Sequence, residues 1–341
     1  MVKILPQEIW RMPADELSRL LESGTFIPKN RKIHFYAPSF MYYKTAYFSS
    51  SPNNFPTISV TGKGCALKCK HCGGKVLEAM RPATTPGEFY STCTELRTMG
   101  AKGCLISGGC LPDGSIPLDD LLDSIKRVKK DLALTIFTHV GMIDFERAKH
   151  LKEAGIDAAL IDIIGSDETI REICNLDLTV SNYDKSLKAL NDAGLNFVPH
   201  VIAGLHHGKL LGEMHALQMI SKYNPSAIVI IAFMPIRGTE MEKVKPPKPI
   251  DIARVIVAAR LMFPDKPIAL GCMRPKGEHR DETDIMAIEA GVDAIAFPSE
   301  KAIKYAEAAG YQLKFSSFCC ARIYMDYNAG HSYSKRINNS C

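Results

Sequence analysis

The chain has 341 residues, of which 46% are hydrophobic and 23% charged. These proportions are typical of a globular protein and exclude a disordered or fibrous one. The 42 Lys and Arg are interspersed with 37 Asp and Glu, for a formal net charge of +5, so composition gives no support to a nucleic-acid partner.

The N-terminal segment and the apolar stretches argue against export and against a membrane anchor. Residues 1–23 mix charged side chains with apolar ones, unlike a signal peptide. The most apolar stretch, residues 227–236, is far shorter than the roughly 20 residues that span a bilayer. We therefore expect a cytoplasmic chain whose 11 cysteines are free to bind metal, to react or to be buried.

From about residue 56 onward, short β-branched runs alternate with segments long enough for helices. This alternation predicts parallel β/α units and therefore an α/β fold. The predicted strands are Thr57–Thr61, Gly103–Ser107, Ala133–Thr138, Ala158–Ile163, Asn196–Ile202, Ala227–Ala232, Pro267–Leu270 and Ala294–Phe297. Eight such strands predict a TIM-barrel-like (β/α) arrangement.

Helix boundaries are visible at several points. Pro13–Glu22 reads as an amphipathic helix, and Phe145–Ala154 and Tyr183–Ala193 each end at a glycine suited to a helix C-cap. The residues after each of these glycines start a predicted strand. These boundaries support the β/α alternation.

The chain divides into three predicted parts. Residues 1–55 form an N-terminal helix and an aromatic-rich lead-in, and residues 56–313 form the barrel. Residues 314–341 have no strong periodicity and contain Cys319, Cys320 and Cys341. We expect this last part to be a tail that returns over the mouth of the barrel.

Three cysteines lie close together directly after the first barrel strand, at Cys65, Cys69 and Cys72. Three thiolates on one loop can bind three irons of a 4Fe-4S cluster and leave the fourth iron open to a small molecule. A zinc site would need a fourth protein ligand, and His71 lies between two of the cysteines, so it is badly placed for this role. Zinc remains the alternative for this loop.

The spacing of Cys65, Cys69 and Cys72, with His71 before the last, resembles the motif of the radical S-adenosylmethionine superfamily. The resemblance implies a 4Fe-4S cluster and S-adenosylmethionine as cofactors. It also implies an external electron donor and reductive cleavage of S-adenosylmethionine to a 5′-deoxyadenosyl radical that abstracts hydrogen from the substrate. The barrel would orient these cofactors and exclude water.

The resemblance also nominates residues that hold S-adenosylmethionine, at the C-terminal ends of the strands. Gly108 and Gly109 match the glycines of the family's Gly-Gly-Glu stretch, but Cys110 replaces the Glu, which puts the contact to the cofactor's amino group in doubt. Gly204 matches the fifth-strand motif that faces adenine. As an alternative, Cys110 is an inert buried thiol.

Polar side chains at other strand ends are further candidates. Asp162 and His139 suit hydrogen bonds to ribose or substrate, and His200 is expected to point into the barrel. His200, Asp162 and Arg274 are the predicted catalytic residues. Each of them alone could equally be a satisfied core residue, so the prediction depends on their convergence.

Further cysteines suggest a second, auxiliary iron-sulfur cluster. The chain resembles biotin synthase, in which three cysteines and an Arg hold such a cluster and sulfur is taken from it. The candidates here are Cys110, Cys272, Cys319 and Cys320, with Arg274 as the arginine and Cys341 as a further thiol. The match is incomplete, because the predicted third to fifth strands contain no cysteine that faces the barrel.

The stretches 34–40 and 59–72 also resemble the archaeal biotin-synthase homologues that include the two-component lipoyl synthases. This resemblance implies a sulfurtransferase of lipoate biosynthesis that inserts sulfur into an octanoyl chain. It further implies a second synthase subunit and an octanoylated carrier protein or peptide as partners.

Two other functions are compatible with the same motif. One is a radical rearrangement or fragmentation without an auxiliary cluster, as in the hydrogenase-maturation and methylornithine-forming relatives. The other is a non-catalytic protein that stores a metal or a cluster. Iron content separates sulfur insertion from the first alternative, since each 4Fe-4S cluster adds about four irons per chain.

Overall fold

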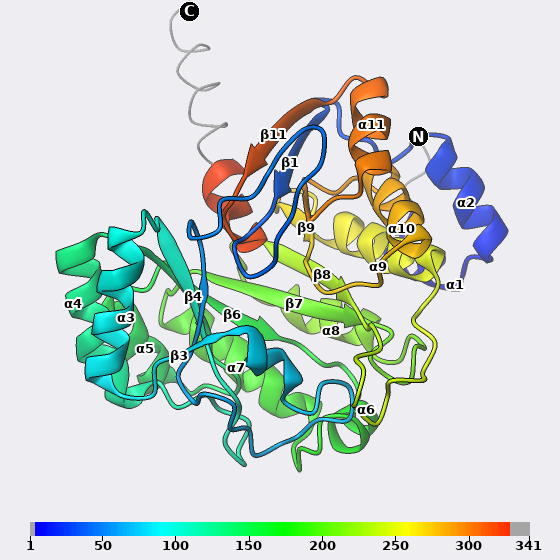
Figure 1. Ribbon diagram of the computed structural model, residues 1–341. Coiled ribbons are helices and arrows are strands. Elements are labelled where there is room, and N and C mark those ends of the chain that lie inside the picture. The colour runs from blue at the N-terminus through cyan, green and yellow to red at the C-terminus, as the bar shows by residue number, and fades with distance from the viewer. Residues whose placement is uncertain (1–3, 328–341) are drawn as a thin grey trace, which may run out of the picture.

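The computed structural model describes residues 4–327, and these form one curved, parallel sheet of 11 strands with helices along its outside (Figure 1). Its strand order is β11-β1-β10-β9-β8-β7-β6-β5-β4-β2-β3. The strands are β1 Lys32–Tyr36, β2 Thr57–Ser59, β3 Arg81–Pro82, β4 Gly103–Ser107, β5 Thr135–His139, β6 Ala158–Asp162, β7 Phe197–Ala203, β8 Ile228–Ala232, β9 Ile268–Leu270, β10 Ala294–Ala296 and β11 Gln312–Ser316.

The helices cover the convex face of the sheet, with α3 to α5 near one end and α9 to α11 near the other (Figure 1). They are α1 Pro6–Arg11, α2 Ala14–Glu22, α3 Pro86–Thr98, α4 Leu122–Leu132, α5 Phe145–Ala154, α6 Asp167–Glu172, α7 Val180–Asp192, α8 Glu213–Ile220, α9 Pro249–Met262, α10 Glu278–Glu289 and α11 Glu300–Ala308. Short 3-10 turns are η1 Lys75–Ala79, η2 Asp119–Leu121 and η3 Cys320–Arg322. In the described part of the chain, none of these helices has the length and apolar character that crossing a bilayer requires.

The predicted α/β barrel fold is confirmed, and all eight predicted strands are present in consecutive order. The barrel is open. Its two end strands are β3, which pairs with β2, and β11, which pairs with β1, so the sheet does not close on itself in the described residues. Local signals account for the helix ends: the Asp144 side chain caps α5, and Gly155 ends it with a left-handed φ of 88°.

Three strands lie where no barrel strand was predicted: the two-residue β3 at one end of the sheet, and β1 and β11 at the other. β1 falls in the lead-in and pairs with both β10 and β11, and β11 straddles the predicted boundary at residue 313. The strands that pair with β1 are far away in sequence, so the local alternation of strands and helices could not reveal β1 and β11. The division into three parts stays a prediction, but one sheet runs through all of its described portions.

The tail prediction is wrong for the residues that the structure describes. Residues 320–324 do not cover the mouth; they pack inside the barrel against side chains at the strand beginnings, including Ala158 and Ala294. The Tyr324 hydroxyl donates to the Asp157 carbonyl, just before β6, over 2.8 Å. The inner face is rich in alanine, which leaves room for this segment. Cys341 lies outside the described residues.

Candidate active site

The cysteine loop, defined here as residues 61–75, follows β2 at the C-terminal ends of the strands. Its backbone is tied to the neighbouring loops: the Ala66 amide donates to the Cys110 carbonyl and the Lys70 amide to the Ile173 carbonyl, both over 2.8 Å. The Asn175 side chain donates to the Leu67 and Lys68 carbonyls over 3.0 and 3.1 Å. These backbone carbonyls and amides already have hydrogen-bond partners in the neighbouring loops. The loop is therefore held in place by its backbone, and its thiols are not needed for that purpose.

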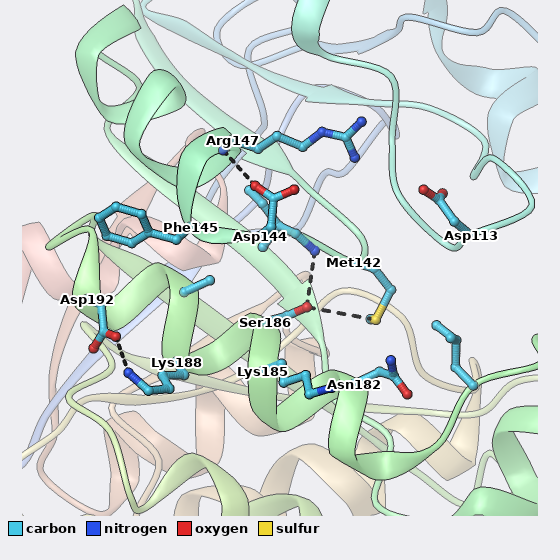
Figure 2. A pocket seen from close by; sticks show the side chains of 13 residues that line it. Asp113, Met142, Asp144, Phe145, Arg147, Asn182, Lys185, Ser186, Lys188 and Asp192 are labelled. Carbon is cyan, nitrogen blue, oxygen red and sulfur yellow. Dashed lines mark hydrogen bonds and ion pairs between the residues drawn. The ribbon is translucent and has the colours of Figure 1, made fainter.

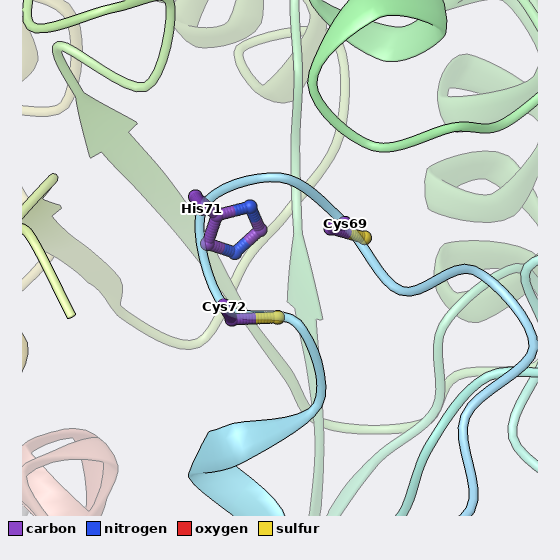
Figure 3. A group of neighbouring side chains, drawn as sticks. All are labelled: Cys69, His71 and Cys72. Carbon is purple, nitrogen blue, oxygen red and sulfur yellow. The ribbon is translucent and has the colours of Figure 1, made fainter. Parts of the chain in front are cut away.

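The loop presents Cys69, His71 and Cys72 on one bend (Figure 3), with one ligand atom of each within 4.8 Å of the others. Cys65 lies beside them, against Gly109. A Cβ at Gly109 would stand 1.9 Å from the Gly64 carbonyl oxygen and 2.5 Å from the Cys65 Cβ. The close approach of the two loops therefore requires glycine at this position.

The donor chemistry of this loop fits an iron-sulfur cluster. A hydrogen bond with Cys174, together with burial, raises the pKa of Cys69 well above its usual value. A hydrogen bond with Cys69 and burial raise the pKa of Cys72 to about 12. Without a cation these thiols hold their protons, and a metal would displace them because thiolate is the form that binds metal. The buried His71 Nδ1 also has no hydrogen-bond partner among the described residues.

The structure brings together His139 at the end of β5, Asp162 at the end of β6 and His200 in the middle of β7. The rings of His139 and His200 are 5.6 Å apart, and Asp162 pairs with His200 in the sheet register. Burial lowers the pKa of His200 to about 4, although Asp162 opposes this shift. Burial also lowers the pKa of His139. Both imidazoles are therefore neutral at pH 7 and can accept or donate one hydrogen bond at each nitrogen.

The tautomer of His200 follows from its contact with the backbone. His200 Nδ1 is 3.1 Å from the Val198 carbonyl oxygen, which can only accept, so Nδ1 carries the proton. Nε2 is left with a lone pair. His200 can thus accept a hydrogen bond from a ligand but does not supply a positive charge.

Packing within the protein favours glycine at positions 108 and 204, whether or not a cofactor is bound. A Cβ at Gly108 would be 3.0 Å from the Val60 Cγ2 atom, and one at Gly204 would be 2.7 Å from Pro247. The Gly204 amide donates to Glu213 Oε1 over 2.8 Å, in a backbone conformation with φ of 72°. Their contact with S-adenosylmethionine stays a prediction.

Glu213, which sequence reasoning assigned no role, is the most unusual acid near this site. It is 5% exposed, its Oε2 atom has no hydrogen-bond partner among the described residues, and burial raises its pKa to about 7. Asn175 was also missed, although it holds the cysteine loop. The only sequence signal for Glu213 was its position after a glycine and before an apolar run.

Arg274 does not reach the substrate side as predicted. It is completely buried, with Nε 2.7 Å from Asp284 Oδ1 and Nη2 3.0 Å from Asp284 Oδ2. It also donates to the carbonyls of Gly271 and Phe297 over 2.6 and 3.2 Å. The placement corrects the catalytic assignment, because an arginine with this many donors engaged serves to position the β9 and β10 loops.

The four cysteines predicted for one auxiliary cluster fall into two groups. Cys110 lies with the cysteine loop, where burial, then Cys65 and Asp162, raise its pKa to about 12. Cys272 lies with Cys319 and Cys320 inside the barrel, at the inner core. Cys110 therefore lies with the cysteine loop, and the predicted auxiliary cluster, in which at most one of the adjacent Cys319 and Cys320 was expected to bind, stays a prediction that depends on the inner group.

The group of Cys272, Cys319 and Cys320 has its own electrostatics. A hydrogen bond from Cys320 lowers the pKa of Cys319 and favours its thiolate, while the same contact raises the pKa of Cys320. Burial raises the pKa of Cys272 to about 11. Arg274 opposes this increase, so the arginine acts on these thiols through its charge.

A separate cavity of about 570 Å³ lies between α5 and α7 (Figure 2). Ser186 of α7 lines the cavity. Its hydroxyl accepts a hydrogen bond from the Ile143 amide over 3.1 Å and donates one to the Met142 sulfur over 3.9 Å. Its lining includes Asp113, Asp144 and Lys185, and includes none of the predicted site residues. This cavity opens on the outer face and does not form part of the candidate site.

Comparison with known proteins supports this description. Residues 59–209 match the model of the Radical SAM superfamily, and residues 230–332 match the Biotin and Thiamin Synthesis associated domain. Biotin synthase of Prochlorococcus marinus is 26% identical over 255 residues, covering 71% of this chain and 73% of that protein. Biotin synthase of Neorickettsia sennetsu is 27% identical over 276 residues, covering 74% and 77%.

Solved structures show the same fold. The hydrogenase maturase HydG superposes with a TM-score of 0.63 at 18% identity, covering 95% of this chain and 74% of that one. Methylornithine synthase superposes with a TM-score of 0.60 at 16% identity, covering 95% and 94%. A 4Fe-4S cluster and S-adenosylmethionine are the cofactors of this superfamily, and the cysteine loop would hold them. The chain carries a radical SAM domain joined to a Biotin and Thiamin Synthesis associated domain, and it belongs to the biotin synthase-like branch of the radical SAM superfamily.

Proposed function

We propose that this radical SAM enzyme inserts sulfur into an unactivated carbon, and that its substrate is an octanoyl chain, as in a lipoyl synthase. The observation that carries the proposal is the group of Cys272, Cys319 and Cys320 inside the barrel. Cys272 follows β9 and the other two thiols lie in the tail, apart from the cysteine loop, so this group could hold a second cluster as a source of sulfur.

The two groups of cysteines suggest how the residues of the chain divide the work. When bound, the cluster and S-adenosylmethionine supply one-electron cleavage and hydrogen abstraction. Cys65, Cys69 and Cys72 would hold that cluster, while neutral His200 would accept a hydrogen bond through Nε2. In the inner group, the hydrogen bond from Cys320 lowers the pKa of Cys319 and so favours the thiolate form that binds metal. Arg274 would stabilise negative charge on these thiols without contacting the substrate.

Biotin synthase relatives support sulfur insertion, and the choice of an octanoyl substrate is the finer part of the proposal. Phe40 and Tyr43 are partly exposed aromatic residues that pack on the buried Phe297, with ring centroids 5.2 and 5.8 Å apart. Such a surface suits an aliphatic chain. Dethiobiotin, which carries a polar cyclic-urea ring on its aliphatic chain, is the competing substrate in the test below.

The proposal includes partners. Lys63 and Lys68 are exposed on the cysteine loop, so an external electron donor with an acidic surface would meet positive charge there. A second synthase subunit and an octanoylated carrier protein or peptide complete the proposed reaction. A cytoplasmic location stays a prediction.

The test measures iron and acid-labile sulfide per chain after anaerobic reconstitution, in wild type and in the C65A/C69A/C72A variant. Iron and sulfide that remain in the variant would support a second cluster; complete loss of both would overturn sulfur insertion and favour single-cluster radical chemistry. Turnover with octanoyl peptide and with dethiobiotin, each with and without a candidate partner subunit, then identifies the substrate through the mass of the sulfur-containing product.

A further inference from the structure

Two imidazoles and two carboxylates face one another where α6 meets the turn after β7. Ligand atoms of Glu172, His206 and His207 lie within 4.8 Å of one another. His207 Nε2 is 2.6 Å from Glu172 Oε1, and His206 Nε2 is 3.7 Å from Glu168 Oε1. None of these side chains belongs to the cysteine loop or to the predicted catalytic set.

A tight turn places the two neighbouring histidines on the same side of the chain. The Lys209 amide donates to the His206 carbonyl over 2.9 Å, and His207 and Gly208 have φ of 50° and 78°. Two central residues with positive φ define a type I′ turn, in which a residue other than glycine is uncommon. As a result the two rings lie 5.1 Å apart and nearly perpendicular.

The surrounding contacts prepare these groups to act as ligands. Thr169, which is 1% exposed, places its hydroxyl 3.2 Å from His206 Nδ1, so Nε2 is the atom left for another partner. Metal-binding histidines usually make such a hydrogen bond through their second nitrogen. Glu168 and Glu172 are four residues apart on α6 and therefore share one face of that helix.

We propose that Glu172, His206 and His207 bind a divalent transition-metal ion such as Zn²⁺, with Glu168 as the fourth ligand. Imidazole and carboxylate are ligands that Zn²⁺ accepts in tetrahedral geometry. Bonds of about 2.0 to 2.2 Å at tetrahedral angles separate the ligand atoms by about 3.4 Å. The observed separations of 2.6 and 3.7 Å lie on either side of that value.

The ion would link two segments that flank the predicted S-adenosylmethionine site. The residues after α6 hold the cysteine loop, because the Ile173 carbonyl accepts from Lys70 and Asn175 donates to two loop carbonyls. On the other side, His206 lies two residues after Gly204. The ion therefore has a structural role, and the inference does not depend on the substrate.

Co²⁺ is the probe, since its X-ray absorption edge is separate from that of iron. The fine structure beyond the edge gives metal–ligand distances, which distinguish nitrogen and oxygen ligands from sulfur ligands. We expect the anaerobically reconstituted protein to bind one Co²⁺ per chain with nitrogen and oxygen ligands at about 2.0 to 2.2 Å. His206→Ala and His207→Ala should each weaken binding at least about 100-fold, because loss of an outer partner alone costs about 10- to 100-fold. His150→Ala, which removes an exposed histidine of α5, is the matched control and should bind like wild type.

Glu172→Gln keeps the size of the side chain and tests the site without removing packing; it should lose Co²⁺ affinity but keep its iron and sulfide content. Thr169→Val should weaken binding about 10- to 100-fold. Unchanged Co²⁺ affinity in Glu172→Gln and His207→Ala would overturn the inference, as would sulfur ligands at about 2.3 Å around the cobalt.

Discussion

The cysteine loop and the inner tail segment, residues 319–324, both bring thiols together, but they do so in opposite ways. Cys65, Cys69 and Cys72 lie on one loop within eight residues, and short-range turns and neighbouring loops fix their positions. Cys319 and Cys320 meet Cys272 only because the chain after β11 turns into the barrel. A group gathered by one loop is visible in sequence, whereas a group gathered by topology is not.

The two regions also differ in their surroundings. The thiols of the loop lie after β2, where the strands terminate, and are partly exposed, as are Cys272 and Cys319, whereas Cys320 is buried. The tail residues lie among aromatic and alanine side chains of the inner core, with Phe318 5.3 Å from Phe55 and Phe137 6.4 Å from Tyr324. We therefore expect loop changes to affect cofactor chemistry first and tail changes to affect both packing and sulfur transfer.

The largest expected effect is at the loop. Replacing Cys65, Cys69 or Cys72 by Ala should each abolish cleavage of S-adenosylmethionine, because an iron would lose its only protein ligand. The measurement is 5′-deoxyadenosine formed per chain under reducing conditions. Cys93→Ala, at a buried cysteine of α3, is the control and should retain cleavage. Retained cleavage in any of the three loop variants would refute the assignment.

The tail thiols should give the complementary result. Cys272→Ala or Cys319→Ala should leave 5′-deoxyadenosine formation near the wild-type level while stopping formation of the sulfur-containing product. The physical reason is that both thiols lie in the inner group, separate from the loop. Mass spectrometry of the product measures the second reaction, and full product formation in both variants would remove the basis for an auxiliary cluster there.

Removal of one partner of the Arg274 and Asp284 pair tests whether the arginine has a structural role. Asp284→Asn should lower the free energy of unfolding by about 3 to 5 kcal/mol, because it leaves a buried guanidinium without its counter-charge. Denaturant unfolding measures this loss. Asp281→Asn is the control on the same helix, since its ion pair with the exposed Lys301 lies at the surface and such pairs are worth about 0 to 1 kcal/mol. Equal losses in the two variants would contradict a structural role.

The smallest effect concerns pH. Burial raises the pKa of Glu213 to about 7, so the folded protein holds this proton more tightly than the unfolded chain, whose glutamate pKa is about 4.3. The stability from this proton is present below that value and is lost as pH rises through about 7, by up to about 3 kcal/mol. Glu213→Gln should flatten the dependence of unfolding free energy between about pH 5 and 8. If Glu213→Gln showed the same pH dependence of unfolding free energy as wild type, the proton responsible would belong to a group other than Glu213.

Much of the fold could be predicted because β/α units are local. The eight predicted strands follow from short apolar runs, and the end of α5 follows from Gly155. β1 could not be predicted in the same way, since Lys32–Tyr36 is a strand only through pairing with β10 and β11. Four of its five residues are buried. The strand that buries them lies some 260 residues away, so the sequence around β1 shows no alternation of apolar and polar residues that would reveal it.

The candidate site shows the same limit. The convergence of His139, Asp162 and His200 follows from parallel strands that end at one edge of a sheet. Arg274 lies at a strand end too, yet Asp284 on α10 binds its guanidinium and keeps it from the site. No spacing in the sequence distinguishes an arginine that faces a substrate from one that faces a buried aspartate.

The β/α architecture and the three thiols of the cysteine loop could be recognised without a structure, because both depend on residues that are neighbours along the chain. The tertiary structure was needed to place residues 319–324 inside the barrel, to separate Cys110 from Cys272 and Cys319, and to bring His206 and His207 against Glu172. These contacts join segments that meet only when the sheet curls, and their free energy comes from burial and charge pairing between distant residues.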